Sequence, residues 1–293
     1  MTKVSWKHSA AGSVLYAAAA VAQNLPLNDP RLNRLLVPAV DDINTQLGAS
    51  DLDWRDFWQA MVKGGFQSRD DLELCENALQ AAGCSSLTVD TMAKAISGAI
   101  TDLRLLFGER FPKLAEQLPL RSGPLRTAWE AYGPGLLRQI AKLTHDELLP
   151  QRVTVWFVQP VAAGGGDADA KSKTVWMEAM LTNVDTQVPE VLRLAWLIAR
   201  VGLGHENANR FVDPGRLPAV ASTALVPIVL AAGRELDLLP TGAWPVPQAT
   251  QLWLRNTAAK RSDIIQSWWR QLSSGETPFP VAIKALDRML QSE

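Results

Sequence analysis

Three side chains are candidates for chemistry because of their types and surroundings: Glu178, His145 and His205. Glu178 lies in an otherwise apolar run, and a buried carboxylate needs a cationic partner, without which its pKa rises. His145 stands near a predicted helix end, where an imidazole can act as a general acid or base or interact with the helix C-terminus. No nucleophile stands beside an identifiable base. We therefore expect His145 to cap a helix at the surface and Glu178 to form a structural ion pair.

His205 begins a partial metal-binding motif. The segment Gly204-His-Glu-Asn-Ala-Asn209 opens like the zinc-peptidase signature His-Glu-x-x-His, in which two imidazoles one helical turn apart hold the metal. Asn209 stands at the second histidine position, and an amide is a poor zinc ligand. We interpret the segment as a loop after a helix. The sequence therefore predicts neither a metal centre nor a cofactor.

A glycine run, Gly164-Gly-Gly166, follows a predicted strand, which is where phosphate-binding loops lie. The run lacks the spacing Gly-x-Gly-x-x-Gly, has no Lys-Ser/Thr pair after it, and leads to another strand instead of a helix. The acids Asp167 and Asp169 would also repel a phosphate. The sequence therefore predicts a flexible hairpin tip here.

Two predicted strands and many predicted helices must position these residues. The segments 152–158 and 174–181 are rich in β-branched and aromatic residues, and both sides of each segment are largely apolar. Because two strands alone are marginal in water, this hairpin must be covered on both faces. Elsewhere apolar residues recur at helical spacing, including a strongly apolar helix that begins at Pro189. The sequence predicts a mainly α, multi-helix globular protein with an inserted two-stranded β-hairpin (about 152–181) packed between helices.

Prolines and glycines punctuate the predicted helices. Pro38 is expected to bend or split its helix, and Gly133-Pro134-Gly135 to break the chain before the next helix. No linker is long or polar enough to force a domain boundary. We therefore expect a single mostly helical domain, 1–293. The alternative is a helical domain 1–150 followed by a domain 151–293 that holds the hairpin and the C-terminal helices.

The order of these elements resembles the catalytic core of the zincin-like metallopeptidases. A Gly-rich hairpin, a strand with an acid and then a helix follow one another over residues 151–203, so the resemblance is one of layout and not of motif. In that family the helix after the strand carries two histidine ligands. The corresponding positions here hold Val191, Leu192, Ala195 and Trp196. The resemblance therefore implies a hydrolase-like or degenerate scaffold without its metal ligands.

Composition and charge exclude some classes of protein. Apolar residues make up 47% of the 293 residues and charged residues 20%, as in ordinary globular domains. The formal net charge of −1 provides no global field that would attract nucleic acid or an anionic membrane. The segment 255–270 does mix basic residues with tryptophans, as single-strand-binding proteins do. Helical spacing there predicts instead a buried apolar stripe with a solvated charged face.

Three features bear on location. Cys75 and Cys84 are expected to be reduced thiols of a cytoplasmic protein, with a single bridge as the alternative. The Ala-rich run 10–22 follows charged residues and resembles a signal peptide, but its apolar middle is weak, so we expect a packed helix. Export is the alternative. The run 217–232 contains two prolines and is shorter than the ~20 residues of a membrane span, so no span is predicted.

These observations predict a soluble helical protein that acts without catalysis, through contacts with a protein partner or with itself. A hydrolase-like enzyme with Glu178, His145 or His205 in its site is the first alternative. Binding of single-stranded nucleic acid through 255–270 is the second. Whether a small molecule also binds is left open by the sequence.

Overall fold

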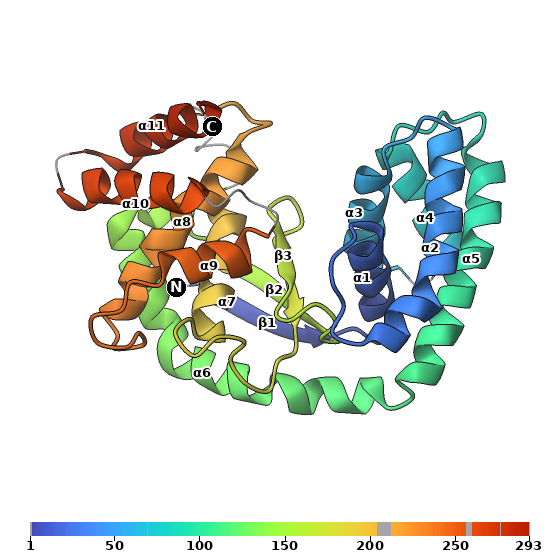
Figure 1. Cartoon of the computed structure of the whole chain (residues 1–293), viewed down its shortest axis with the longest axis horizontal. Helices are drawn as coiled ribbons and strands as arrows, with labels where there is room; N and C mark the ends of the chain where they lie inside the picture. Colours follow the sequence, from blue (N-terminus) through green and yellow to red (C-terminus); the bar gives the residue numbers. More distant parts are fainter. Residues whose placement is uncertain (1, 69, 204–211, 256–259, 276, 293) are drawn as a thin grey trace. The chain divides into compact units, whose positions relative to one another are not determined.

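The structure, a computed structural model, describes residues 2–68, 70–203, 212–255, 260–275 and 277–292 (Figure 1). The chain divides into two compact units. The first unit comprises Met1–Lys7, Arg121–Val155 and Gly164–Glu293, and the second comprises His8–Leu120 and Trp156–Ala163. Each unit is therefore built from pieces that are distant in the sequence.

The second unit is a set of helices around an alanine-rich centre. Its helices are α1 (Ala10–Ala22), α2 (Pro30–Ala49), α3 (Trp54–Gly64), α4 (Asp71–Ala81), α5 (Val89–Arg110) and the start of α6 (Leu114–Leu143). The helix α1 packs against α2, α3 and α5, and most of its residues are buried. Small side chains let neighbouring elements approach closely. A Cβ on Gly65 would lie 2.1 Å from the side chain of Leu15. The Ala-rich run is thus a helix packed into this unit.

A four-stranded mixed sheet spans the start and the middle of the chain. Its strands are β1 (Lys3–His8), β2 (Arg152–Val158), β3 (Gly166–Asp169) and β4 (Thr174–Glu178), in the order β1-β2-β4-β3. The amide of Lys3 donates to the carbonyl of Gln151, and that of Ser9 donates to Phe157, so β1 runs parallel to β2. The strands β3 and β4 are antiparallel, with Gly166 opposite Met177 and Asp169 opposite Thr174.

The mainly α fold is confirmed, but the predicted two-stranded hairpin at 152–181 is wrong in detail. The two predicted strands are neighbours in the sheet, yet the true hairpin joins β4 to β3, which lies in the segment predicted to be a flexible tip. Asp167 on β3 forms an ion pair with Arg200 at 2.7 Å. That pair and the strand pairing fix the segment. All of β4 is buried, as a strand covered on both faces should be, whereas β2 is only partly covered.

Helices of the first unit pack against one another, and one of them also packs against the sheet. They are α7 (Glu190–Leu203), α8 (Leu217–Arg234), α9 (Val246–Trp253), α10 (Lys260–Ser273) and α11 (Phe279–Gln291), with the short 3-10 helix η1 (Asp146–Leu148) before the sheet. The helix α7 contacts β3, β4 and α8, and α8 also contacts α9, α10 and α11. Since α7 and α8 are buried along almost their whole length, they form the core of this unit.

Three helices continue through internal prolines, so Pro38 does not split its helix. The helix α2 contains Pro38, α8 contains Pro227, and α6 continues for 30 residues through the predicted break at Gly133-Pro134-Gly135. In α6 a glycine precedes Pro134, and a glycine has no Cβ to clash with the following proline ring. The same holds for Gly123-Pro124. The predicted break at Gly133-Pro134-Gly135 is therefore wrong, and the glycine before the proline removes one part of the steric conflict there.

The helix α8 is long and apolar enough to cross a membrane, judged by length and composition alone. However, 78% of its most apolar window is buried inside the protein. A core helix of a soluble protein passes the same test, so α8 is weak evidence for a span. No other helix among the described residues meets the criterion.

Candidate functional site

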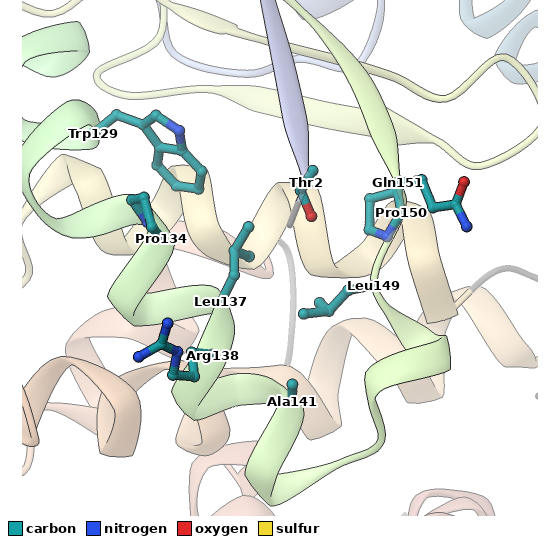
Figure 2. A pocket seen from close by; sticks show the side chains of 9 residues that line it. All are labelled: Thr2, Trp129, Pro134, Leu137, Arg138, Ala141, Leu149, Pro150 and Gln151. Carbon is teal, nitrogen blue, oxygen red and sulfur yellow. The ribbon is translucent and has the colours of Figure 1, made fainter.

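A pocket of about 450 Å³ lies in the first unit, beside the second half of α6 (Figure 2). One wall comes from α6 and the other from the segment that leads into β2, together with the residue before β1. The lining residues are Thr2, Trp129, Pro134, Leu137, Arg138, Ala141, Leu149, Pro150 and Gln151. A volume of this size falls in the range of roughly 300–1,000 Å³ typical of ligand pockets.

Trp129 is held at the pocket by its neighbours on α6 and β1. Its ring meets the ring of Trp6 edge-on, with centroids 6.5 Å apart and an interplanar angle of 81°. The indole also lies over Gly133, where an added Cβ would be only 2.4 Å from the ring. Glycine at this helical position is thus required by the close approach of Trp129. Because the sequence predicts a chain break at Gly133, the pocket that this glycine shapes could not be predicted.

The opposite wall is held by the sheet and by α7. The carbonyl of Gln151 accepts the amide of Lys3 at 2.9 Å, which joins this wall to β1. On α7, a Cβ at Gly202 would lie 1.9 Å from the carbonyl oxygen of Leu148, so η1 approaches the helix backbone directly. One wall is therefore a helix, and the other is a short segment that is fixed by its contacts with β1 and α7.

The pocket is apolar at its walls and carries one cation among its lining residues. Trp129, Leu137 and Ala141 are buried, whereas the side chains of Arg138 and Gln151 are exposed. Arg138 forms no ion pair within the described part of the chain. A guanidinium binds carboxylates and phosphates through two parallel hydrogen bonds. The pocket therefore suits an apolar group next to an anion. It contains no nucleophile beside a base, so binding is the chemistry that it supports.

Glu178 lies elsewhere in the first unit, under the glycine run. Its side chain is 0% exposed, and its Oε2 accepts the amide of Gly164 at 2.6 Å. Gly164 has a φ of +89°, and a Cβ there would lie 2.7 Å from Val184 and 2.8 Å from a guanidinium nitrogen of Arg193. A buried carboxylate that accepts a backbone amide holds the backbone in place. Glu178 thus anchors the segment that precedes β3.

A buried ion pair stands next to this anchor. Glu190 and Arg193 on α7 are both buried, and the Arg193 guanidinium donates to the Glu190 carboxylate. Burial raises the pKa of Glu190, and the negative charge of Glu178 raises it further, while Arg193 opposes both effects. One cation therefore faces two carboxylates in a closed environment. Glu190 and Arg193 are not among the candidate residues predicted from the sequence, although they are the only charged residues among the first ten of α7.

Of the other two candidate residues, His145 does not join this cluster. His145 is exposed before η1, and its Nδ1 accepts the Glu147 amide at 3.4 Å, so its surroundings differ from those of the buried Glu178. His205 lies outside the described residues. Within the described residues, no three His, Cys, Asp or Glu side chains come together as a metal site would require.

The tryptophans of the 255–270 region are packed against other parts of the first unit. Trp253 is 7% exposed and stacks on Trp196 with centroids 5.5 Å apart. Trp268 is 1% exposed and donates its Nε1–H to the carbonyl of Ala282 at 2.7 Å. Ile265 of the same helix is also buried. In this arrangement neither Trp253 nor Trp268 presents a face for stacking with a base.

Comparison with known proteins gives no family for this chain. No protein-family model matches it, no curated protein matches it, and no solved structure matches it.

Proposed function

We propose that the protein acts without catalysis, by binding a segment of a partner protein in the pocket beside α6. The observation that supports this most directly is the combination of a preformed pocket of about 450 Å³, apolar walls and the exposed Arg138. A recognition pocket of this kind needs no base or nucleophile. The hydrolase-like alternative is less favoured because the α7 positions that would supply ligands hold buried apolar residues such as Leu192 and Trp196.

The pocket chemistry specifies the partner segment. The side chains of Trp129, Leu137 and Ala141 offer apolar and aromatic surface for one large side chain. Arg138 offers a partner for one carboxylate. The C-terminal residue of a chain can present both groups at once, with its side chain beside its own carboxylate. We therefore infer that the segment bound is a C-terminal aromatic or aliphatic residue with a free carboxylate.

The test uses a fluorescein-labelled peptide ending in Gly-Ser-Phe, as the free acid and as the C-terminal amide, followed by fluorescence anisotropy. The free acid should bind more tightly than the amide. Arg138→Gln should weaken binding of the acid by about threefold to fivefold and leave the amide unchanged, since an exposed charge pair contributes up to about 1 kcal/mol. The control is Arg121→Gln, because Arg121 lies on the same helix outside the pocket.

A second variant tests the space in the pocket without changing the charge of Arg138. Ala141→Phe adds a ring to the buried wall without altering the charge, and it should weaken the binding of both the free acid and the amide. Equal binding of acid and amide by the native protein would contradict the carboxylate part of the proposal. Unchanged binding in Ala141→Phe would contradict the pocket itself. Light scattering of the unliganded protein tests the remaining form of the proposal, in which the partner is a second copy of the chain.

We also propose a cytoplasmic location. Cys75 is buried, and Cys84 is not bridged to it, which fits a reducing compartment. The helix α1 contributes to the core of the second unit, so its removal as a signal peptide would delete part of that core. Export remains the alternative, and cell fractionation of the tagged protein distinguishes the two.

A further inference from the structure

A second hollow, of about 320 Å³, lies in the first unit beside β1 and β2. The lining residues are Lys3, Ser5, Arg152, Val153, Thr154, Ser172 and Lys173. Lys3 and Ser5 stand two positions apart on β1, as do Arg152 and Thr154 on β2. Because side chains at such positions project from one face of a sheet, two strands contribute a cation and a hydroxyl each to the same face.

Three cations surround this hollow without neutralising partners. Lys3, Arg152 and Lys173 form no ion pair within the described part of the chain. No acidic side chain is among the lining residues. The nearest acid in the sequence, Asp169, accepts the hydroxyl of Ser172 at 2.5 Å. Like charges gathered in this way repel one another, and a bound anion relieves the repulsion.

Lys173 is held toward the other cations by the backbone. Its φ is +54°, a left-handed conformation that a lysine rarely adopts. Its carbonyl accepts the amide of Thr154 at 3.0 Å, which ties the turn before β4 to β2 next to Arg152. The hydroxyls of Ser5 and Thr154 form no hydrogen bond among the described residues, so both can donate to a ligand.

We propose that this hollow binds the phosphate of a small phosphorylated molecule. A phosphate monoester carries up to two negative charges and three acceptor oxygens, which match three cations and two hydroxyl donors. The volume of about 320 Å³ leaves room for an organic group beside the phosphate. The net charge of the chain is −1, so the cluster is a local feature and not part of a general polyanion-binding surface. The inference does not depend on the peptide-binding proposal, because the two pockets share no lining residue.

The test is isothermal titration of the full chain with inorganic pyrophosphate at low ionic strength. Lys3→Gln, Arg152→Gln and Lys173→Gln should each weaken binding by about threefold to fivefold, and raising the salt concentration should weaken it further. The matched control is Lys171→Gln, since Lys171 is exposed in the same turn but does not line the hollow. Lys173→Gly removes the charge and also relieves the strained φ, so it should weaken binding while circular dichroism shows a folded protein.

Two results would overturn the proposal. The first is no binding of pyrophosphate, or binding that Lys171→Gln weakens as much as Lys173→Gln does, because the attraction would then be diffuse. The second is tight binding of a single-stranded oligonucleotide that pyrophosphate does not displace, since the ligand would then be a nucleic acid strand.

Discussion

At Gly164 both the backbone conformation and the neighbouring side chains oppose any residue larger than glycine. Gly164→Ala would place a Cβ at a φ of +89° and within 2.8 Å of Val184 and Arg193. We expect a loss of about 2–4 kcal/mol in the free energy of unfolding, because strain and overpacking add together. Urea denaturation followed by tryptophan fluorescence measures this loss.

A second glycine provides the control for Gly164. Gly242 also has a positive φ, +76°, but no atom lies within 4 Å of the position that a Cβ would take. Gly242→Ala should therefore cost only the backbone strain, about 1 kcal/mol. If both variants lose the same stability, the packing around Gly164 is not what the structure indicates.

Glu190 gives the stability of the protein a defined dependence on pH. Burial raises its pKa above the ordinary value of 4.5, so the folded state holds this proton more tightly than the unfolded state does. The resulting stabilisation is fully present below about pH 4.5 and is lost as the pH rises through the folded pKa. Relative to the native protein, Glu190→Gln should therefore gain stability as the pH rises above about 4.5, as urea denaturation at a series of pH values would show.

The comparison needs a carboxylate that is open to water. Glu130 is exposed on α6. The free energy of unfolding of Glu130→Gln should therefore change with pH in the same way as that of the native protein. A Glu190→Gln curve that also runs parallel to the native one would mean that the proton of Glu190 is not linked to folding.

At the residue scale the sequence identified Glu178 as an unusual acid but not its role. Its apolar neighbours predict burial, and the side chain is fully buried. Its contact with Gly164 could not be predicted, because the hydrogen bond depends on a positive φ fourteen residues earlier in the chain. The ion pair of Glu190 with Arg193 could have been predicted, because a glutamate and an arginine three positions apart on an apolar helix lie on the same side of it.

At the scale of the elements, a substitution in α6 tests how the helix positions Trp129 in the pocket. Gly133→Ala places a Cβ 2.4 Å from the ring of Trp129, so the indole must move. Gly123→Ala is the matched control, because Gly123 also precedes a proline in α6 and nothing lies within 4 Å of its Cβ position. Both variants share the clash with the following proline. Gly133→Ala should be about 1–3 kcal/mol less stable than Gly123→Ala in urea denaturation.

Gly133→Ala should also weaken the binding of the free-acid peptide more than Gly123→Ala does, because Trp129 forms part of the pocket wall. Equal peptide affinity in the two variants would show that the position of Trp129 does not matter for binding.

The sequence predicted helices well and the sheet only in part, for identifiable reasons. The strand β1 alternates exposed Lys3, Ser5 and Lys7 with less exposed residues, a period of two that marks a strand. Its lysines were instead interpreted as the charged start of a signal-like segment. The strand β3 consists of Gly-Asp-Ala-Asp, residues depleted in strands, so only its pairing with β4 makes it one.

At the scale of the whole molecule, the two thiols report whether the second unit is closed. Cys75 is 0% exposed, and burial raises its pKa to about 12, whereas Cys84 is half-buried. At pH 8 only about one in ten thousand Cys75 side chains is a thiolate. A thiol reagent should therefore modify only Cys84 quickly in the native protein. In guanidinium it should modify both cysteines quickly.

Two variants assign the fast thiol. Cys84→Ser should abolish the fast phase, and Cys75→Ser should keep it. Equal rates for both thiols in the native protein would show that the second unit opens on the time scale of the reaction. The absence of free thiol without reductant would instead reveal a bridge, and it would contradict the cytoplasmic proposal.

The division of the sequence into one domain or two stays a prediction, since neither unit is a single stretch of chain. The boundaries fall within β1, α6 and β2 and after Ala163. An independent domain is ordinarily bounded by exposed linkers where few contacts cross. Here three of the four boundaries fall inside regular elements.

The pairing of β1 with β2 has a consequence for biosynthesis. Lys3 donates to Gln151, which the ribosome adds 148 residues later. At about 5–20 residues per second, β1 waits roughly 7–30 s before its partner exists. Through that interval its backbone amides and carbonyls are open to other strands, and Lys3 and Lys7 on this edge discourage such pairing. We therefore expect Lys3 and Lys7 to protect the nascent chain before β1 pairs with β2.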